Sequence, residues 1–222
     1  MDIPYFVVHY SKNIDRKQRL EKEFKKYEIS FVKWVKEYDR ENMTEKEHLY
    51  KHLKKYSEKP INKGQISLTL KHYYALEQII KNEIPISVIM EDNVTFTDNI
   101  KEKVQDYLKE ATDRKLEWDI IFDGDTHYLK YKEGKVTGDK KLYKKTNKIT
   151  DQCQGSTRCS NFYIITLNAA RKYYKAFTPF YNVCDHWSNH LFRKLHFNIW
   201  WVEPPIVHRI MNHKRVEESG AN

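Results

Sequence analysis

The segment Ile86–Met90 is an almost wholly apolar run, and three residues with side-chain oxygens follow it directly: Glu91, Asp92 and Asn93. A short apolar run of this length predicts a buried strand. In open α/β sheets, ligands bind beyond the carboxyl ends of the strands, so the three polar residues would stand where a ligand is expected. Hard oxygen ligands suit Mg or Mn, whereas a turn or a helix N-cap is the alternative explanation of such a strand end.

Strand-like and helical segments alternate along the chain, which predicts an α/β sandwich whose sheet is mostly parallel in its first half. A capping pattern of Thr44 with Glu47 predicts one charged helix that runs to about Tyr56. The other predicted strands are Tyr5–His9, Ile29–Val35, Trp118–Phe122, Asn161–Thr166 and Ile199–Val202, and the other predicted helices span about 12–27, 64–82, 98–112, 169–177 and 185–195.

The length of 222 residues allows one well-cored domain, and we expect a single domain over residues 1–222. Residues 128–148 are rich in lysine, and Gly134 and Gly138 offer turns within them. We therefore expect a solvated hairpin there, as a lysine-rich insertion at about residues 126–150.

The formal charge of +9 comes from 31 Lys and only nine Arg. Lysine lacks the planar fork that recognises phosphate and guanine edges in two places at once, so recognition of nucleic acid is not expected. The excess charge either solvates the surface or attracts an anionic substrate, lipid head group or polyanion.

Three cysteines, Cys153, Cys159 and Cys184, form no C-x-x-C pair, and no secretory signal precedes them. We expect all three to be free thiols. The chain has no apolar window near the roughly 18 residues that a membrane span requires, so no transmembrane segment is predicted. The default expectation is a soluble cytosolic (cytoplasmic) protein of unknown oligomeric state.

The predicted helix that begins near Gly64 carries polar residues on a buried stripe. Gln65 and His72 are seven residues apart, which returns a side chain to almost the same direction on a helix. Polar groups on a buried stripe need partners. His72 is either a satisfied core histidine or, if it lies near the acidic strand end, part of a site.

Two further candidates lie where a strand ends. His9 and Tyr10, with Arg16 in the next helix, occupy the first strand-to-helix junction, which can receive an anion or a nucleotide or can simply be capped. Asp125 closes Asp123-Gly124-Asp125, which is similar to the D-x-D signature of nucleotide-sugar enzymes but is equally compatible with a tight turn.

Two more candidates lie late in the chain. Asp185 starts a helix beside His186 and Trp187, and a partly apolar wall could raise its pKa enough for a general base. A structural acid at a helix N-terminus is the alternative. His208 could complete a metal site or simply be exposed.

Taken in order, these segments resemble glycosyltransferase family 25, which includes lipopolysaccharide-type galactosyltransferases and collagen galactosyltransferase domains. The chain departs from the family at four places: His9-Tyr10 stand where the family has Asn-Leu, Gln65 where it has Glu, Lys71 where it has Ser, and Asn93 where it has Asp. Compared with Asp, Asn93 keeps a side-chain oxygen but loses the negative charge. The matching segments are Pro4–Val8 with Asp15-Arg16, Gly64–Ile66 with His72, Val88–Asn93, Trp118–Ile121, Asn161–Ile165, Asp185 and Pro204–Val207.

The resemblance implies a GT-A-like (Rossmann-like) fold with a mixed, mostly parallel sheet flanked by helices. It also implies an inverting transfer of a hexose, galactose or glucose, from a UDP-sugar donor to a hydroxyl of a glycan, a lipid-linked glycan or a hydroxylysine-type protein acceptor. A divalent metal, Mn or Mg, would neutralise charge on the departing diphosphate.

The resemblance assigns roles to individual residues. Asp185 is the preferred general base and Asp125 its competitor. The metal and diphosphate site would use Glu91, Asp92, Asn93 and His208, and the donor site would use His9, Tyr10, Arg16, Gln65 and His72. The alternative is a module without catalytic activity, either a transferase relic or a polyanion binder that uses the lysine-rich region.

Overall fold

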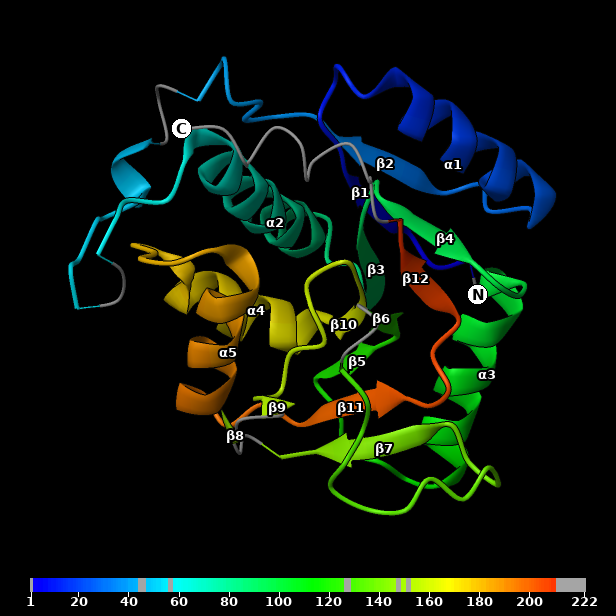
Figure 1. Ribbon diagram of the computed structural model, residues 1–222. Coiled ribbons are helices and arrows are strands. Elements are labelled where there is room, and N and C mark those ends of the chain that lie inside the picture. Colours follow the sequence, from blue (N-terminus) through cyan, green and yellow to red (C-terminus); the bar gives the residue numbers. More distant parts are fainter. Residues whose placement is uncertain are drawn as a thin grey trace.

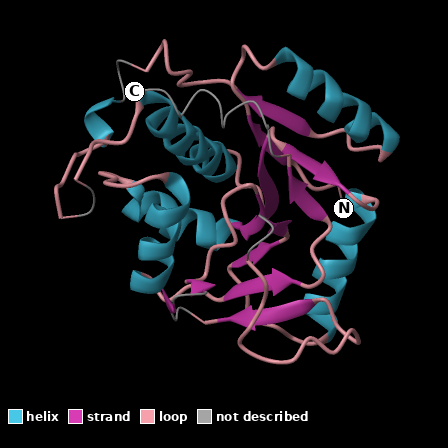
Figure 2. Ribbon diagram, viewed as in Figure 1, coloured by secondary structure: helices cyan, strands magenta, loops and turns pink. Residues whose placement is uncertain are grey.

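The computed structural model describes residues 2–43, 47–55, 58–125, 129–146, 149–150 and 153–210. A seven-stranded sheet lies between two layers of helices (Figures 1 and 2). Two of its strands, β10 and β7, run opposite to the other five. In spatial order the strands are β2 (Val32–Val35), β1 (Tyr5–Val8), β3 (Ile86–Glu91), β10 (Phe162–Thr166), β5 (Ile120–Phe122), β11 (Ile199–Val202) and β7 (Leu142–Lys145).

The predicted α/β fold, with a mixed, mostly parallel sheet flanked by helices, is therefore confirmed, as expected for a GT-A-like, Rossmann-like arrangement. Helices from both halves of the chain cover one face of the sheet, and two others cover the opposite face (Figure 1). The first group is α2 (Lys63–Lys81), α4 (Leu167–Phe177) and α5 (Cys184–Lys194), and the second is α1 (Ile14–Lys26) and α3 (Ile100–Asp113).

Burial on both faces explains why the strands are apolar without alternation. In β3, Ile89 packs in the core under α2, α4 and α5, whereas Val88 and Met90 pack in the core under α1 and α3. All three side chains are fully buried. Successive strand residues point to opposite faces, so one short run supplies both cores.

A smaller sheet gathers three segments that are far apart in the sequence. Its strands are β4 (Val94–Phe96), β12 (Val207–Arg209) and β6 (Gly124–Asp125), with β12 in the middle. β4 and β12 were not predicted, because each has three residues and gives too short a pattern to recognise. This sheet brings together the segments that follow β3, β5 and β11 in the chain. A further short pair is β8 (Ile149–Thr150) with β9 (Cys153–Gln154).

The predicted helix from Thr44 to about Tyr56 is wrong in its described part. Only Glu47–Leu49 form a 3₁₀ turn, and residues 50–55 are not helical; 44–46 and 56–57 lie outside the described residues. The backbone here bonds to Phe180 instead, through the amide of Lys51 and the carbonyl of Leu49. Leu49 and Tyr50 pack against the core from this irregular segment, so tertiary contacts override the local helical pattern.

The predicted lysine-rich hairpin is also wrong for the described residues. β7 pairs with β11 and forms an edge of the main sheet, and Leu142, Tyr143 and Lys145 are buried. Lys145 lies over the ring of Trp201, and its ammonium pairs with Glu133. High lysine content hid a strand, because a long lysine stem can pack on apolar surface while its charge is paired. Residues 126–128 and 147–148 lie outside the described part.

Replacing Ile89 by alanine should lower the free energy of unfolding by about 2–5 kcal/mol, because it opens a cavity in the central strand where Ile89 is fully buried. Urea denaturation would measure this change. Ile14→Ala, at a residue that is 60% exposed, is the matched control and should change stability by no more than about 0.5 kcal/mol. Equal losses in the two variants would contradict the assignment of β3 to the core.

Candidate functional site

The carboxyl ends of β1 and β3 meet at one edge of the sheet. The two strands are parallel neighbours, and Val8 lies opposite Glu91. The amide of Asp92 donates to the carbonyl of Val8 over 3.1 Å, so the pairing continues one residue beyond β3. The register therefore brings His9 beside Asp92, and α1 begins shortly after this point.

Asp92 is the centre of a buried cluster of charges and is only 5% exposed. Its Oδ2 lies 2.8 Å from His9 Nδ1, and its Oδ1 accepts a 2.9 Å hydrogen bond from Arg16 Nη1. Arg19 Nη2 donates to the backbone carbonyl of Asp92 over 3.0 Å. Burial opposes ionisation of Asp92, but the contacts with His9 and Arg16 outweigh it and lower the pKa of the carboxyl.

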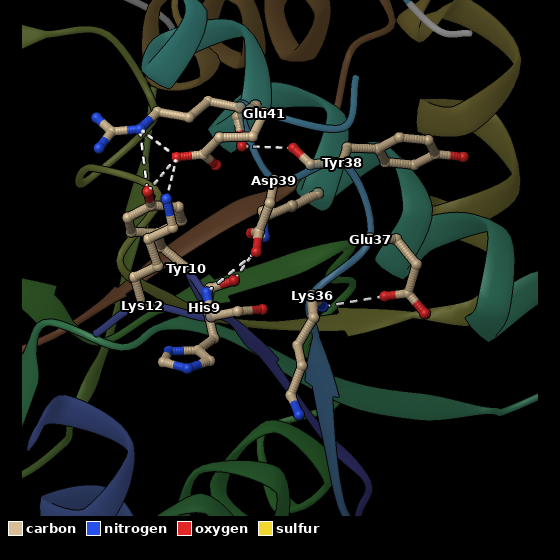
Figure 3. A network of polar contacts seen from close by, with 12 residues as sticks. His9, Tyr10, Lys12, Lys36, Glu37, Tyr38, Asp39 and Glu41 are labelled. Carbon is tan, nitrogen blue, oxygen red and sulfur yellow. Dashed lines mark hydrogen bonds and ion pairs between the residues drawn. The ribbon is translucent and has the colours of Figure 1, made fainter. Parts of the chain in front are cut away.

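A second ion pair supports the same junction from the loop after β2. The ammonium of Lys71, on α2, donates to the carbonyl of His9 over 2.5 Å and pairs with Asp39. Asp39 also accepts from the amide of Ser11 over 3.2 Å (Figure 3). Burial lowers the pKa of Lys71, and the pairing with Asp39 counteracts that shift. This pair fixes the backbone that carries His9.

Tyr10 lies on the outer side of the same junction. Its hydroxyl donates to Glu41 Oε1 over 2.5 Å, Lys12 donates to the same oxygen over 3.0 Å, and Arg40 lies 4.7 Å from the Tyr10 ring centroid (Figure 3). The hydrogen bonds from Tyr10 and Lys12 lower the pKa of Glu41 to about 2. Tyr10 is thus held in the loop network and not in the buried cluster around Asp92.

Glu91 points to the opposite side, toward α2. Its Oε1 accepts a 2.8 Å hydrogen bond from Ser160 and lies 3.9 Å from His72 Nε2, and its Oε2 accepts from Asn93 Nδ2 over 3.3 Å. Burial opposes the charged form of Glu91, but His72, Ser160 and the charge of Arg209 together lower its pKa.

His72 is fully buried and lies beside Cys184, at the start of α5, as well as beside Glu91. Its Nδ1 is 3.0 Å from the hydroxyl of Tyr163. Burial alone would lower the pKa of His72, but Cys184 and Glu91 raise it to about 10. His72 therefore links α2, α5 and the end of β3, and it lies near the acidic strand end.

Gln65 is not brought to His72. Its side-chain oxygen accepts from the amide of Asn62 over 2.8 Å, and Asn62 Oδ1 accepts from the amide of Gln65 over 3.0 Å. The two residues form a capping box at the start of α2. The spacing of Gln65 and His72 along the helix is as predicted. In the first turn, however, backbone amides lack helical partners, and the side chain of Gln65 bonds to one of them.

Asp185 lies in the first turn of α5, directly after Cys184, and is half-buried. Its Oδ1 accepts from the amide of His186 over 2.9 Å. Asn189, one turn later, accepts from the amide of Thr157 over 2.7 Å. This face of α5 therefore borders the loop that also carries Ser160, the partner of Glu91.

The second acidic strand end is shaped by a close approach. A Cβ on Gly124 would lie 1.9 Å from Asn161 Oδ1, so only glycine fits there. Asp123 is fully buried and accepts from Tyr107 and from the amide of Ile206, and burial raises its pKa to about 7. Asp125 lies opposite His208 in the pairing of β6 with β12, and the Asp125 side chain lies outside the description.

The expected metal ligands do not form a chelating set. Both carboxylate oxygens of Asp92 are engaged by His9 and Arg16, and those of Glu91 by Ser160 and Asn93. Asn93 Oδ1 is buried without a hydrogen-bond partner and is one oxygen only. Among the described residues, no group of three His, Cys, Asp or Glu side chains could hold a metal ion. As arranged, these side chains do not fit one.

Several residues of this site were not predicted as functional: Asp39, Lys71, Arg19 and Ser160. Arg19 is three residues after Arg16, so helical spacing could have identified it. Asp39 and Ser160 lie in irregular segments, and nothing in the sequence indicates which distant group they contact. Neither Cys159 nor Cys184 forms a disulfide in the described part of the chain, which agrees with the prediction for these two residues, and the Cys153 side chain lies outside the description.

The comparisons with known proteins identify the family. The model of glycosyltransferase family 25 (LPS biosynthesis protein) matches residues 2–187, which include the elements of the clusters around Asp92 and Glu91 except β12 and the later part of α5. The chain belongs to this family. Among the described residues, no helix is both long and apolar enough to cross a membrane.

Curated relatives include procollagen galactosyltransferases and proteins named as inactive. Procollagen galactosyltransferase 1-B of Xenopus laevis is 25% identical over 125 residues, 54% of this chain and 20% of the relative. Procollagen galactosyltransferase 2 of Homo sapiens is 29% identical over 69 residues, 31% of this chain and 11% of the relative. "Probable inactive glycosyltransferase 25 family member 3" of Rattus norvegicus is 30% identical over 69 residues, 31% and 12% respectively.

The matches thus span between about a tenth and a fifth of these relatives' length. A solved structure, "Crystal Structure of A197 from STIV", is similar with a TM-score of 0.45 and 11% identity, and the match covers 96% of this chain and 87% of that chain.

Replacing Asp92 by asparagine should reduce stability at pH 7 and weaken its dependence on pH. The folded-state pKa of Asp92 is lowered, so its charge stabilises the fold above the unfolded value of about 4, and this contribution is lost as the pH falls through the folded value. Urea unfolding at several pH values from 7 to 3 would show the two proteins converge on acidification. Asp106→Asn, on the exposed face of α3, is the control for loss of a carboxylate. A stability difference that stays constant or widens would contradict the assignment.

Proposed function

We propose that this protein is a glycosyltransferase that moves a hexose, galactose or glucose, from a UDP-sugar to a hydroxyl group with inversion at the anomeric carbon. The observation that carries the proposal is the cluster of Arg16, Arg19 and His9 around Asp92. It stands at the carboxyl ends of two parallel strands, in a chain of glycosyltransferase family 25.

The junction offers donors for a nucleotide diphosphate. Arg19 Nη1 and His9 Nε2 are buried nitrogen atoms without a hydrogen-bond partner in the described part of the chain. Asn13, which precedes α1, makes no side-chain cap to the helix, so first-turn amides remain available to an anion. Buried polar groups are normally satisfied, so the two nitrogens support a bound polar ligand at this place.

The proposed reaction is a single displacement. A carboxylate takes the proton of the acceptor hydroxyl while the oxygen of that hydroxyl bonds to the anomeric carbon. The bond from the anomeric carbon to the diphosphate oxygen breaks, which releases UDP. Asp185 is the preferred base, because its face of α5 borders the loop of Ser160, next to Glu91. Asp125 remains the competitor. Arg16 and Arg19 would stabilise the negative charge on the leaving diphosphate.

The divalent metal expected from the resemblance stays a prediction. When bound, Mn or Mg would neutralise charge on the diphosphate. The side chains described here do not fit a chelated ion, and no step above depends on one. The galactosyltransferase names of the relatives support galactose as the first sugar to test, and the acceptor hydroxyl could belong to a glycan, a lipid-linked glycan or a protein.

A module without catalytic activity is the second candidate. The strand end favours it, because Asn93 stands where the family has an Asp. The carboxylates of Glu91 and Asp92 beside it are already paired. Several relatives also carry the word inactive in their names. Binding of a polyanion by the lysine-rich segment is less favoured, because its β7 is an integral strand of the sheet.

UDP should raise the melting temperature of the protein, and Arg16→Ala should weaken UDP binding at least about tenfold, or about 1.4 kcal/mol. The reason is that Arg16 is the partly exposed cation of the cluster, with 27% of its side chain accessible. Thermal shift and calorimetric titration would measure both effects, with manganese and with a chelator. Stabilisation by UDP only when manganese is present would support the metal prediction.

The matched control is Arg171→Ala, an exposed arginine that pairs with Glu83 at a distance from the site. It should leave UDP binding unchanged. Absence of any shift with UDP, UDP-galactose or UDP-glucose would overturn the proposed donor. Steep weakening of binding by salt without a response to the nucleotide would favour the polyanion-binding alternative.

Asp185→Asn should lower the rate of sugar transfer about 10²–10⁴-fold and leave UDP affinity within twofold of the original, because it removes a base but no donor contact. The comparison requires transfer assays with a panel of hydroxyl acceptors and a separate UDP titration. Full activity in this variant, with loss of activity in Asp125→Asn, would assign the base to Asp125 instead.

A further inference from the structure

A polar loop, residues 155–161, lies buried at the edge of the sheet that carries the acidic strand ends. Loops normally run over the surface, because a buried loop must find partners for all its polar groups. In this loop, Ser156, Arg158 and Asn161 are each only 1% exposed. The loop therefore brings polar side chains into the interior beside the candidate site.

The loop contacts two parts of the site. At one end, the amide of Thr157 donates to Asn189 Oδ1 on α5 over 2.7 Å. At the other end, Ser160 donates to Glu91 Oε1 over 2.8 Å, and the carbonyl of Asn161 accepts from the amide of Glu91 over 2.9 Å. The loop thus connects the helix that carries the preferred base with the end of β3.

The side chain of Asn161 has no partner for its polar atoms. Both Oδ1 and Nδ2 are buried, and neither makes a hydrogen bond within the described part of the chain. A primary amide can accept two hydrogen bonds and donate two. Leaving such a group buried and unpaired costs free energy, and buried polar groups in folded proteins normally have partners. Asn161 therefore indicates a polar ligand at this place.

The position of this amide is fixed by the close approach of another strand end. Asn161 Oδ1 lies 1.9 Å from the point where a Cβ on Gly124 would stand. β10 lies between β3 and β5 in the sheet, so the amide lies beside the ends of both strands (Figure 1). Packing against the glycine positions the amide without using its capacity for hydrogen bonds.

A second unpaired amide oxygen lies on the same side of the sheet. Asn93 Nδ2 donates to Glu91 Oε2 over 3.3 Å, which places the Asn93 side chain beside Glu91. Asn93 Oδ1 is buried and has no partner among the described residues. Tyr163, two residues after Asn161, packs in the core under α2, so alternation along the strand directs Asn161 to that face as well.

We propose that Asn161, together with Asn93, binds hydroxyl groups of the transferred hexose. An amide both donates and accepts hydrogen bonds, as a sugar hydroxyl does, whereas a carboxylate only accepts them. Two neutral amides therefore suit a neutral sugar better than an anion.

The place also suits the sugar of the donor. The arginines on the α1 side would hold the diphosphate, and the first turn of α5 borders the loop, since Thr157 Oγ1 donates to the carbonyl of Asp185 over 3.5 Å. The transferred sugar must lie between the diphosphate and the base. The choice of a sugar rests on the proposed function, whereas the unpaired amides are features of the structure itself.

Calorimetric titration with UDP, UDP-galactose and UDP-glucose tests this subsite. Asn161→Ala and Asn161→Leu should each weaken the better bound UDP-sugar at least tenfold and leave the affinity for UDP within twofold, because only the sugar contacts the amide. Asn161→Leu keeps the branched shape of the side chain, so it stays informative if Asn161→Ala folds poorly. It should also keep the melting temperature of the ligand-free protein, since it removes an amide that has no partner.

Asn82→Ala is the matched control, because Asn82 is an exposed asparagine at the end of α2 whose amide donates to the carbonyl of Gln78. It should leave all three affinities unchanged. Normal UDP-sugar affinity in both Asn161 variants would overturn the subsite. Equal weakening of UDP and UDP-sugars, with a lower melting temperature, would overturn it as well and assign Asn161 a structural role.

Titration with methyl galactoside and methyl glucoside, followed by saturation-transfer NMR, separates the subsite from the proposed function. If UDP does not bind but a glycoside binds the original protein and not the Asn161 variants, the donor proposal is refuted and the subsite stands. If UDP binds and the Asn161 variants bind UDP-sugars normally, only the subsite is refuted. If neither UDP-sugars nor glycosides bind, both are refuted.

Discussion

The parallel pairing of β1 with β3 is the constraint on which the site depends. It sets Val8 opposite Glu91, so the residue after each strand, His9 and Asp92, meets the other at 2.8 Å. A shift of one residue would turn every side chain of β3 to the opposite core, and both cores are filled. The apolar packing of the sheet thus fixes the positions of charges that contribute little to that packing themselves.

The charges at this edge form two oppositely directed groups. Asp92 faces α1 and its arginines, and Glu91 faces α2, where burial opposes the charged form of His72 but Cys184 and Glu91 raise its pKa. Each buried carboxylate is thereby compensated, as buried ions must be. Among the described residues, two buried nitrogens on the α1 side, Arg19 Nη1 and His9 Nε2, have no hydrogen-bond partner, which agrees with an anionic ligand there.

The layers and most elements could be predicted from the sequence, because buried helices and strands carry long runs of apolar residues at a recognisable spacing. It failed where a segment is short or charged: β12 has three residues, and β7 is hidden among lysines. Within the site, His72 was a candidate from its place on the buried helical stripe, but whether it lies near Glu91 could not be decided from the sequence. The pairing of Asp39 with Lys71 was not expected, since the loop after β2 has no periodicity from which its path could be inferred.

The missing side chain of Gly124 has a further consequence. The space that a Cβ would need is occupied by the amide of Asn161, and the backbone carbonyl of Asn161 accepts from the amide of Glu91 over 2.9 Å. The two acidic strand ends therefore share one structural support. A side chain at the middle residue of Asp123-Gly124-Asp125 would displace Asn161 and is therefore expected to disturb the strand end that carries Glu91, although Glu91 lies on another strand.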